Sequence, residues 1–299
     1  MNKQTQPKER PNSSELIPIF KELLPVYVIK GFFKASGKLF YQRLFSPVIL
    51  IWCFIYQRLS TDHTLDNILS HVESGAVDHL DNKHKQTVSE RIAPTDTGAL
   101  SKARKRLPFS VLQRCVEHTG QTTREMLPEQ ALWFGHHVGL LDGSTLLLRP
   151  FGDIVSHYGT HKNQHGNTYW ALMRIVVVFC LFTGAVLSVA EGSLYISEQD
   201  LASIVFAQAI ATSVYVGDRN FGIFKIVQLA RHYNVFVLLR LTKDRVRSIA
   251  ERNGINKLSI NDDKKLNWYP SKYDQLYPGI SAFAYHGSLD IPLNTKRWF

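Results

Sequence analysis

Residues 138–147 constrain the fold most strongly, because they form an apolar run that a single carboxylate, Asp142, interrupts. A run of this length is too short for a typical helix and fits a buried strand. An ionised Asp in a buried strand has to be paired, neutralised or bound to a metal, since an uncompensated buried charge is very costly. Residues 213–221 repeat the pattern, with Asp218 between a short apolar strand and a turn. Two strand-borne carboxylates far apart in the chain suggest a site for divalent metal ions.

The order of elements after residue 131 predicts how these strands meet. Hydrophobic periodicity predicts five strands, at residues 138–148, 174–182, 185–190, 213–217 and 234–241. The fifth is almost wholly apolar and is therefore expected in the interior of the sheet. Helices are expected after the cap-like residues 197–200 and at residues 222–232. Three sequential strands, then helix, strand, helix and strand is the order of the ribonuclease H-like fold, in which the first strand and the end of the fourth lie side by side.

The first part of the chain has a helical period. Residues 1–14 form a polar leader, and residues 15–130 are expected to form an all-helical domain that binds DNA. The predicted fold class is α/β, a ribonuclease H-like mixed sheet with flanking helices that follows this helical domain. The catalytic core, incomplete as it stands, is expected at residues 131–243. Residues 244–299 are polar, with turn-forming dipeptides, and are compatible with the short strands of an inserted β-rich region.

A basic cluster lies in a segment expected to be a helix that opens near Thr97 or Ser101 and ends at Pro108. The cluster consists of Lys102, Arg104, Lys105 and Arg106. A second helix follows the proline, and two short helices around a basic cluster are compatible with insertion at a DNA groove or phosphate backbone. A charge run alone is more often a solvated helix face. The charge of the whole chain favours DNA contact.

Composition supports a polyanionic partner without requiring one. The chain has 35 Lys and Arg against 25 Asp and Glu, a formal net charge of +10 that is spread over both halves. Such a surface suits DNA, although a merely basic protein would have the same balance. The three cysteines are widely spaced, so a reducing cytosol is expected and no disulfide framework is implied. Residues 171–190 approach the length of a membrane span, but Arg174 and the Thr183-Gly184 pair favour two strands and a turn.

Two carboxylates on separate elements are what two-metal phosphoryl transfer needs. Asp142 would bridge the two ions and Asp218 would hold one of them. Mg²⁺ fits because it prefers oxygen ligands and keeps water and substrate phosphate in its shell, and Mn²⁺ can substitute for it. Arg219 is placed to contact phosphate, although a structural ion pair would explain it equally well. Either aspartate alone is weak support, because an Asp at the end of a strand is more often a cap or turn residue.

The segments around both aspartates resemble the DDE transposases of the insertion-sequence-four type. The resemblance covers roughly residues 50–245. It is carried by residues 103–108, 141–144, 173–176, 183–187 and 217–222. Its most specific part is the Asp-Arg-x-Phe motif after a strand, at residues 218–221. The resemblance implies that Asp142 and Asp218 are the first two acidic ligands, that the helical part binds transposon ends, and that a β insertion starts after Lys243.

The resembled family has a third acidic ligand, a Glu in a later helix within a Tyr-x-x-Arg-x-x-x-Glu pattern. No Glu follows Glu251 in this chain. Glu251 follows Asp218 at a spacing that suits other DDE families, but it falls where this family has its insertion. We therefore expect a transposase that is truncated before the catalytic Glu.

Three functional hypotheses follow. The first is an insertion-sequence transposase that acts as a homodimer on double-stranded DNA. It would cleave element ends, join the freed 3′-hydroxyl to target DNA, and work in the cytoplasm of a prokaryote at the nucleoid, without a membrane. The alternative is a catalytically inactive DNA-binding remnant that inhibits transposition. The third is a ribonuclease H-like nuclease without strand transfer, whose cleavage would not depend on an end sequence.

Other candidate sites in the sequence are weaker. His157, His161 and His165 are four residues apart, which would align metal ligands on a helix, but two glycines in the segment favour a polar loop. Ser144 lacks the context of a nucleophile elbow, and the sequence has no glycine-rich phosphate loop of the P-loop or dinucleotide type. Stacking on unpaired bases is possible for four aromatic residues, with core packing as the more common fate. These are Tyr158, Tyr169, Trp170 and Phe221.

Overall fold

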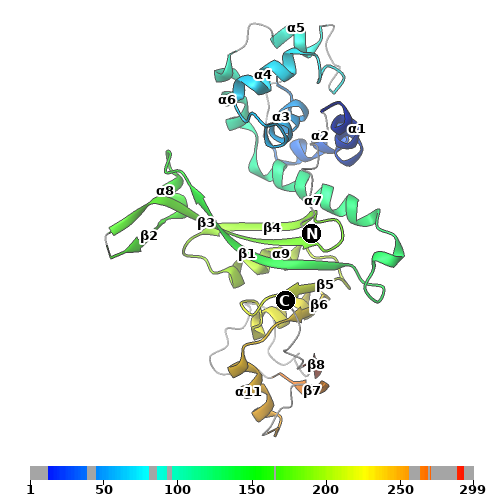
Figure 1. The fold of residues 1–299 in the computed structure, drawn as a ribbon, viewed down its shortest axis with the longest axis vertical. Helices are drawn as coiled ribbons and strands as arrows, with labels where there is room; N and C mark the ends of the chain where they lie inside the picture. Colours follow the sequence, from blue (N-terminus) through cyan, green and yellow to red (C-terminus); the bar gives the residue numbers. More distant parts are fainter. Residues whose placement is uncertain are drawn as a thin grey trace, which may run out of the picture. The chain divides into compact units, whose positions relative to one another are not determined.

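The structure is a computed structural model that describes residues 13–38, 45–80, 86–92, 96–164, 166–255, 263–268, 270 and 288–292. The chain forms two compact units, Met1–Thr123 and Arg124–Phe299 (Figure 1).

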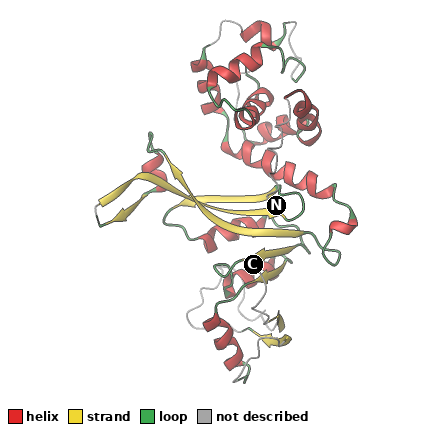
Figure 2. Ribbon diagram, viewed as in Figure 1, coloured by secondary structure: helices red, strands yellow, loops and turns green. Residues whose placement is uncertain are grey.

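The described residues of the first unit lie in helices and their connecting turns (Figure 2). The helices are α1 (Ser13–Leu23), α2 (Val26–Ala35), α3 (Pro47–Leu59), α4 (Leu65–Glu73), α5 (Val88–Ile92), α6 (Thr97–Arg106) and α7 (Phe109–Glu125), the last of which runs on into the second unit. The centre of the unit is α3. Its first seven residues are all buried. It begins with Pro47 at the first helical position, and the Ser46 side chain caps it by accepting from the Ile49 N–H.

The second unit combines a mixed sheet with flanking helices. Its elements are η1 (Glu129–Ala131), β1 (Val138–Leu148), α8 (Ile154–Tyr158), β2 (Thr160–Asn163), β3 (Gly166–Cys180), β4 (Val186–Ser193), α9 (Glu198–Ala207), β5 (Val214–Gly217), α10 (Phe224–His232), β6 (Phe236–Leu239), α11 (Lys243–Arg252), β7 (Asp263–Asn267) and β8 (Ser288–Pro292). The long strand β3 pairs antiparallel with β1, β2 and β4. On its other side β1 runs parallel to β5, and β5 runs parallel to β6. A separate antiparallel pair is formed by β7 and β8.

The pairing of β1 with β5 confirms the adjacency expected from the order of elements. Leu141 lies opposite Gly217 in this parallel register. Asp142 is therefore the next residue of β1, and Asp218 is the first residue after β5. The predicted bounds of the first strand, residues 138–148, are those of β1.

The core of the second unit lies between the sheet and two helices. The helix α9 contacts β3, β4 and α10. Its buried side chains join Leu141 of β1 and the apolar face of α10 in one cluster. The apolar faces of α9 and α10 determine which face of the sheet is buried. Packing within the sheet is also close, because a Cβ at Gly139 would fall 2.6 Å from Val178 Cγ1.

Three sequence predictions about strands and helices are wrong or incomplete. The strand β6 lies at an edge of the described sheet instead of in its interior, with Phe236 and Leu238 exposed. Its partly buried Val237 and Leu239 pack on the core. Burial therefore alternates along β6, but the sequence does not reveal this because the side chains on both faces are apolar. Residues 243–252 form α11, capped by Thr242, where a β-rich region was expected to begin. The second strand starts at Gly166, well before the predicted residue 174.

None of the described helices is both long and apolar enough to cross a membrane. Residues 171–190, the segment that approaches a membrane span in length, belong to β3 and β4 and the turn between them.

Candidate metal-binding site

The two predicted metal ligands lie side by side at the parallel seam of the sheet. Neighbouring strands are about 4.8 Å apart, so the backbones of Asp142 and Asp218, each one step beyond the paired Leu141 and Gly217, are close neighbours. The Gly143 N–H donates to Asp142 Oδ1 at 2.9 Å. The Asn220 N–H donates to Asp218 Oδ1 at 2.9 Å, and this bond closes the turn after β5.

Both aspartates are exposed, which corrects the expectation that Asp142 sits in a buried strand. The burial of β1 alternates, with Gly139 and Leu141 buried and Leu140 and Asp142 exposed. Because β5 ends at Gly217, β1 has no parallel neighbour beyond Leu141. The desolvation argument for a metal therefore does not apply here. The argument that remains is the adjacency of two acidic groups, whose mutual repulsion a shared cation would relieve.

The acidic pair fits Mg²⁺ that is bound by two carboxylates and completes its shell with water and phosphate. Within the described part of the chain, no ion pair involves Asp142 or Asp218. The described residues also contain no group of three or more His, Cys, Asp or Glu that could hold a metal ion. Mg²⁺ commonly binds through one or two carboxylates and completes its shell with water and substrate phosphate. Two exposed carboxylates, one on β1 and one directly after β5, meet that requirement.

A third carboxylate, Glu198, contacts residues next to this pair, Gly143 and Asn220, and was missed by the sequence analysis. Glu198 is the first residue of α9, and its Oε2 accepts a hydrogen bond from Asn220 Nδ2. It also lies against the backbone of β1, because a Cβ on Gly143 would fall 2.5 Å from Glu198 Cδ. Gln199 Nε2 donates to Asn220 Oδ1 at 2.7 Å, so two residues of α9 hold the Asp218 turn. No sequence pattern marks Glu198, since an acidic residue is ordinary in the first turn of a helix.

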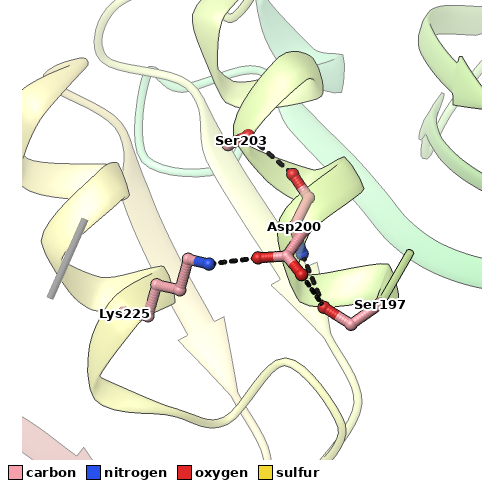
Figure 3. A network of polar contacts seen from close by, with 4 residues as sticks. All are labelled: Ser197, Asp200, Ser203 and Lys225. Carbon is pink, nitrogen blue, oxygen red and sulfur yellow. Dashed lines mark hydrogen bonds and ion pairs between the residues drawn. The ribbon is translucent and has the colours of Figure 1, made fainter. Parts of the chain in front are cut away.

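The start of α9 is fixed by a polar network with α10 (Figure 3). Lys225 of α10 forms an ion pair with Asp200. Ser197 donates to the other carboxylate oxygen of Asp200 at 2.5 Å and accepts from the Asp200 N–H at 3.1 Å. The hydrogen bond from Lys225, followed by the one from Ser197, lowers the pKa of Asp200 below its ordinary value. The network therefore anchors the turn of helix that carries Glu198.

The predicted DNA-binding residues differ in their surroundings. In the first unit, Lys102 and Lys105 are exposed on α6, and Arg106 at its end is also exposed. Arg104 is half-buried, with its Cζ 4.6 Å from the centre of the Phe54 ring. Burial, and next the charge of Arg58, lowers the pKa of Arg104. Arg104 thus packs against its own unit.

In the second unit, Arg219 is exposed in the turn directly after Asp218.

The predicted stacking residues divide into core and surface. Phe221 is 1 % exposed and belongs to the core, so core packing, the more common of the two expected fates, applies to it. Tyr169 is 68 % exposed and Trp170 39 % exposed on β3. Tyr158 is partly buried at the end of α8, and burial, with Glu191 nearby, raises its pKa to about 12.

The remaining candidates lie apart from a common site. His157 lies in α8 and His161 in β2, so the expected polar loop is partly regular structure, and His165 lies outside the described residues. Ser144 and Glu251 are exposed, on β1 and α11 respectively.

Comparison with solved structures finds a distant neighbour, a cryo-EM structure of the piggyBac transposase synaptic complex with hairpin DNA. The two chains have 10 % sequence identity and a TM-score of 0.37 over 83 % of this chain. The match covers 55 % of the neighbour, so this chain spans about half of that protein's length. No family model matches the sequence. No curated protein matches it either.

Proposed function

We propose that this chain is a DNA transposase of the DDE type with a ribonuclease H-like core, which binds element ends and catalyses metal-dependent cleavage and strand transfer. The parallel register of β1 and β5 carries the proposal, because it makes Asp142 and Asp218 neighbours. The strand order β4-β3-β1-β5-β6 and the helices α9 and α10 support the fold assignment. The basic surface of α6 supports a DNA partner.

Each residue would have a separate task in this reaction. Asp142 and Asp218 would hold Mg²⁺ or Mn²⁺, which supplies Lewis-acid stabilisation of the phosphate and a more acidic attacking water. In the cleavage step the water oxygen bonds to phosphorus, the bond to the 3′-oxygen breaks, and that oxygen takes up a proton. Arg219 would pair with the phosphate beside Asp218. Lys102 and Lys105 would contact the DNA backbone without reading its sequence.

A second candidate function is DNA binding without catalysis. It is favoured by the lack of a third acidic ligand within the residues that the structure describes. In that case the chain would occupy element ends and compete with an active transposase.

A nicking assay on supercoiled plasmid carrying element ends, with Mg²⁺ or Mn²⁺, tests both candidates. Transposase chemistry predicts metal-dependent nicking that Asp142→Asn and Asp218→Asn both abolish, while DNA binding in a gel-shift assay is retained. Asp153→Asn is the matched control, since Asp153 is an exposed Asp of the same unit with no side-chain cap bond. Undiminished nicking by Asp142→Asn would refute the assignment, and DNA binding without nicking in either metal would favour the second candidate.

A further inference from the structure

We propose that Glu198 is a positioning residue that, through Asn220, holds the Asp218 turn beside Asp142. The contact set consists of Glu198, Asn220 and Gly143, which we call the carboxylate lock. The proposal rests on the proposed function of Asp142 and Asp218 as metal ligands. It adds a residue from a third element, α9, to a site otherwise built from β1 and β5.

The lock connects three separate parts of the chain. Asn220 uses its backbone N–H to bond Asp218 Oδ1 and its side-chain amide to bond Glu198. The amide oxygen of Asn220 accepts from Gln199 Nε2, so the donor and acceptor ends of this amide are both engaged by α9. Asn220 therefore transmits the position of α9 directly to the carboxylate of Asp218.

Gly143 gives the lock its contact with β1. The carboxylate of Glu198 occupies the space that a Cβ of Gly143 would take. Successive side chains of a strand project to opposite faces, so Asp142 projects away from the face on which Glu198 lies. The alternating burial of β1 agrees, with Leu141 buried and Asp142 exposed. Glu198 thus supports the strand from behind, which is the geometry of a positioning group and not of a third metal ligand.

The lock is itself held in place by two anchors. The ion pair of Asp200 with Lys225 fixes the first turn of α9 to α10 (Figure 3). Beyond the Asp218 turn, Gly222 approaches the Arg240 carbonyl so closely that a Cβ there would clash with backbone. The turn that carries Asp218 and Asn220 is therefore held on one side by α9, through Glu198 and Gln199, and on the other side by the close approach of Gly222 to the Arg240 backbone.

The test is Mn²⁺ affinity measured by isothermal titration calorimetry on the full chain. Groups that orient metal ligands typically change metal affinity by about ten- to one-hundredfold when removed. We expect Glu198→Ala and Asn220→Ala each to weaken Mn²⁺ binding by about tenfold. Glu198→Gln keeps an oxygen that can accept from Asn220, so it should retain the wild-type affinity. Glu129→Ala, at an exposed Glu of the same unit, is the matched control and should have no effect.

Gly143→Ala provides a second, independent variant. Replacing a strand Gly by Ala ordinarily does not destabilise a protein, because it lowers the entropy of the unfolded chain. Here the new Cβ would displace Glu198, so we expect wild-type thermal stability with Mn²⁺ affinity as weak as that of Glu198→Ala. In the Gly143→Ala/Glu198→Ala double variant the space is free, and the affinity should equal that of Glu198→Ala alone.

Three outcomes would refute the proposal that Glu198 is a positioning residue. One is wild-type affinity in Glu198→Ala while Asp142→Asn has lost binding. Another is a loss in Glu198→Gln as large as in Glu198→Ala, which would make Glu198 a ligand through its charge. The third is an additive loss in the double variant. A wild-type chain that binds no Mn²⁺ would instead refute the proposed function, and with it the lock's purpose, so the two failures are distinguishable.

Discussion

Phe221 offers a sharp test of how the segment after Asp218 is built. Its side chain is 1 % exposed and packs in the cluster formed by β1, β3, β4, β5, α9 and α10. Truncation to Ala would remove almost the whole ring from that cluster and leave a cavity. A change of this kind costs about 3–5 kcal/mol. Phe221→Ala should therefore lower the free energy of unfolding by that amount, measured by urea denaturation and far-ultraviolet circular dichroism.

Tyr169→Ala is the control for this measurement, because Tyr169 is an aromatic residue of the same unit that is 68 % exposed. Its substitution should change the free energy of unfolding by less than about 0.5 kcal/mol. If Phe221→Ala proved as stable as Tyr169→Ala but bound single-stranded DNA more weakly, Phe221 would be a surface stacking residue. That result would refute the packing described for the Asp218 turn.

Four further perturbations test other parts of the structure. Burial lowers the pKa of His71 below 6.5, and Trp52 Nε1 donates to its Nε2, so the free energy of unfolding should be highest above pH 6.5 and fall as the pH drops through the folded-state pKa. In urea titrations, His71→Gln should reduce this pH dependence, and an unchanged dependence would count against the assignment. The double variant Lys102→Ala/Lys105→Ala should make the plot of log DNA affinity against log salt concentration less steep by about 1.8, since each phosphate contact contributes about 0.9 to its steepness. An unchanged slope would mean that these two lysines lie on a solvated face of α6. Arg104→Ala should instead lower stability by about 0.5–1 kcal/mol, as measured by urea denaturation, by removing a cation–π contact. Glu251→Ala should leave Mn²⁺ affinity in calorimetry unchanged, and a loss would restore Glu251 as a third ligand.

The local elements around the site were predictable because their sequence patterns are unambiguous. The bounds of β1 follow from an apolar run that only Asp142 interrupts, and the positions of α9 and α10 follow from a cap-like start and from apolar residues at helical spacing. The adjacency of Asp142 and Asp218 followed from the order of elements, because that order leaves few ways to arrange the strands.

Three features were not predictable, each for a physical reason. Asp142 is exposed because it projects to the same face of β1 as the exposed Leu140, and the face that is buried is set by the packing of α9 on the sheet and not by β1 itself. The edge position of β6 was hidden because both of its faces carry apolar side chains. The contact of Glu198 with Gly143 joins residues 55 positions apart (198 minus 143), and the sequence around neither residue predicts the contact.

The measurement that tests the central claim most directly is Mn²⁺ titration of the wild-type chain, Asp142→Asn, Asp218→Asn and the double variant by calorimetry. If both aspartates hold the same metal, each single substitution should weaken binding by at least about tenfold. The double variant should then lose less than the sum of the two single losses, because the groups act on one ion. Wild-type affinity in either single variant, or fully additive losses, would contradict a shared metal site at the β1–β5 seam.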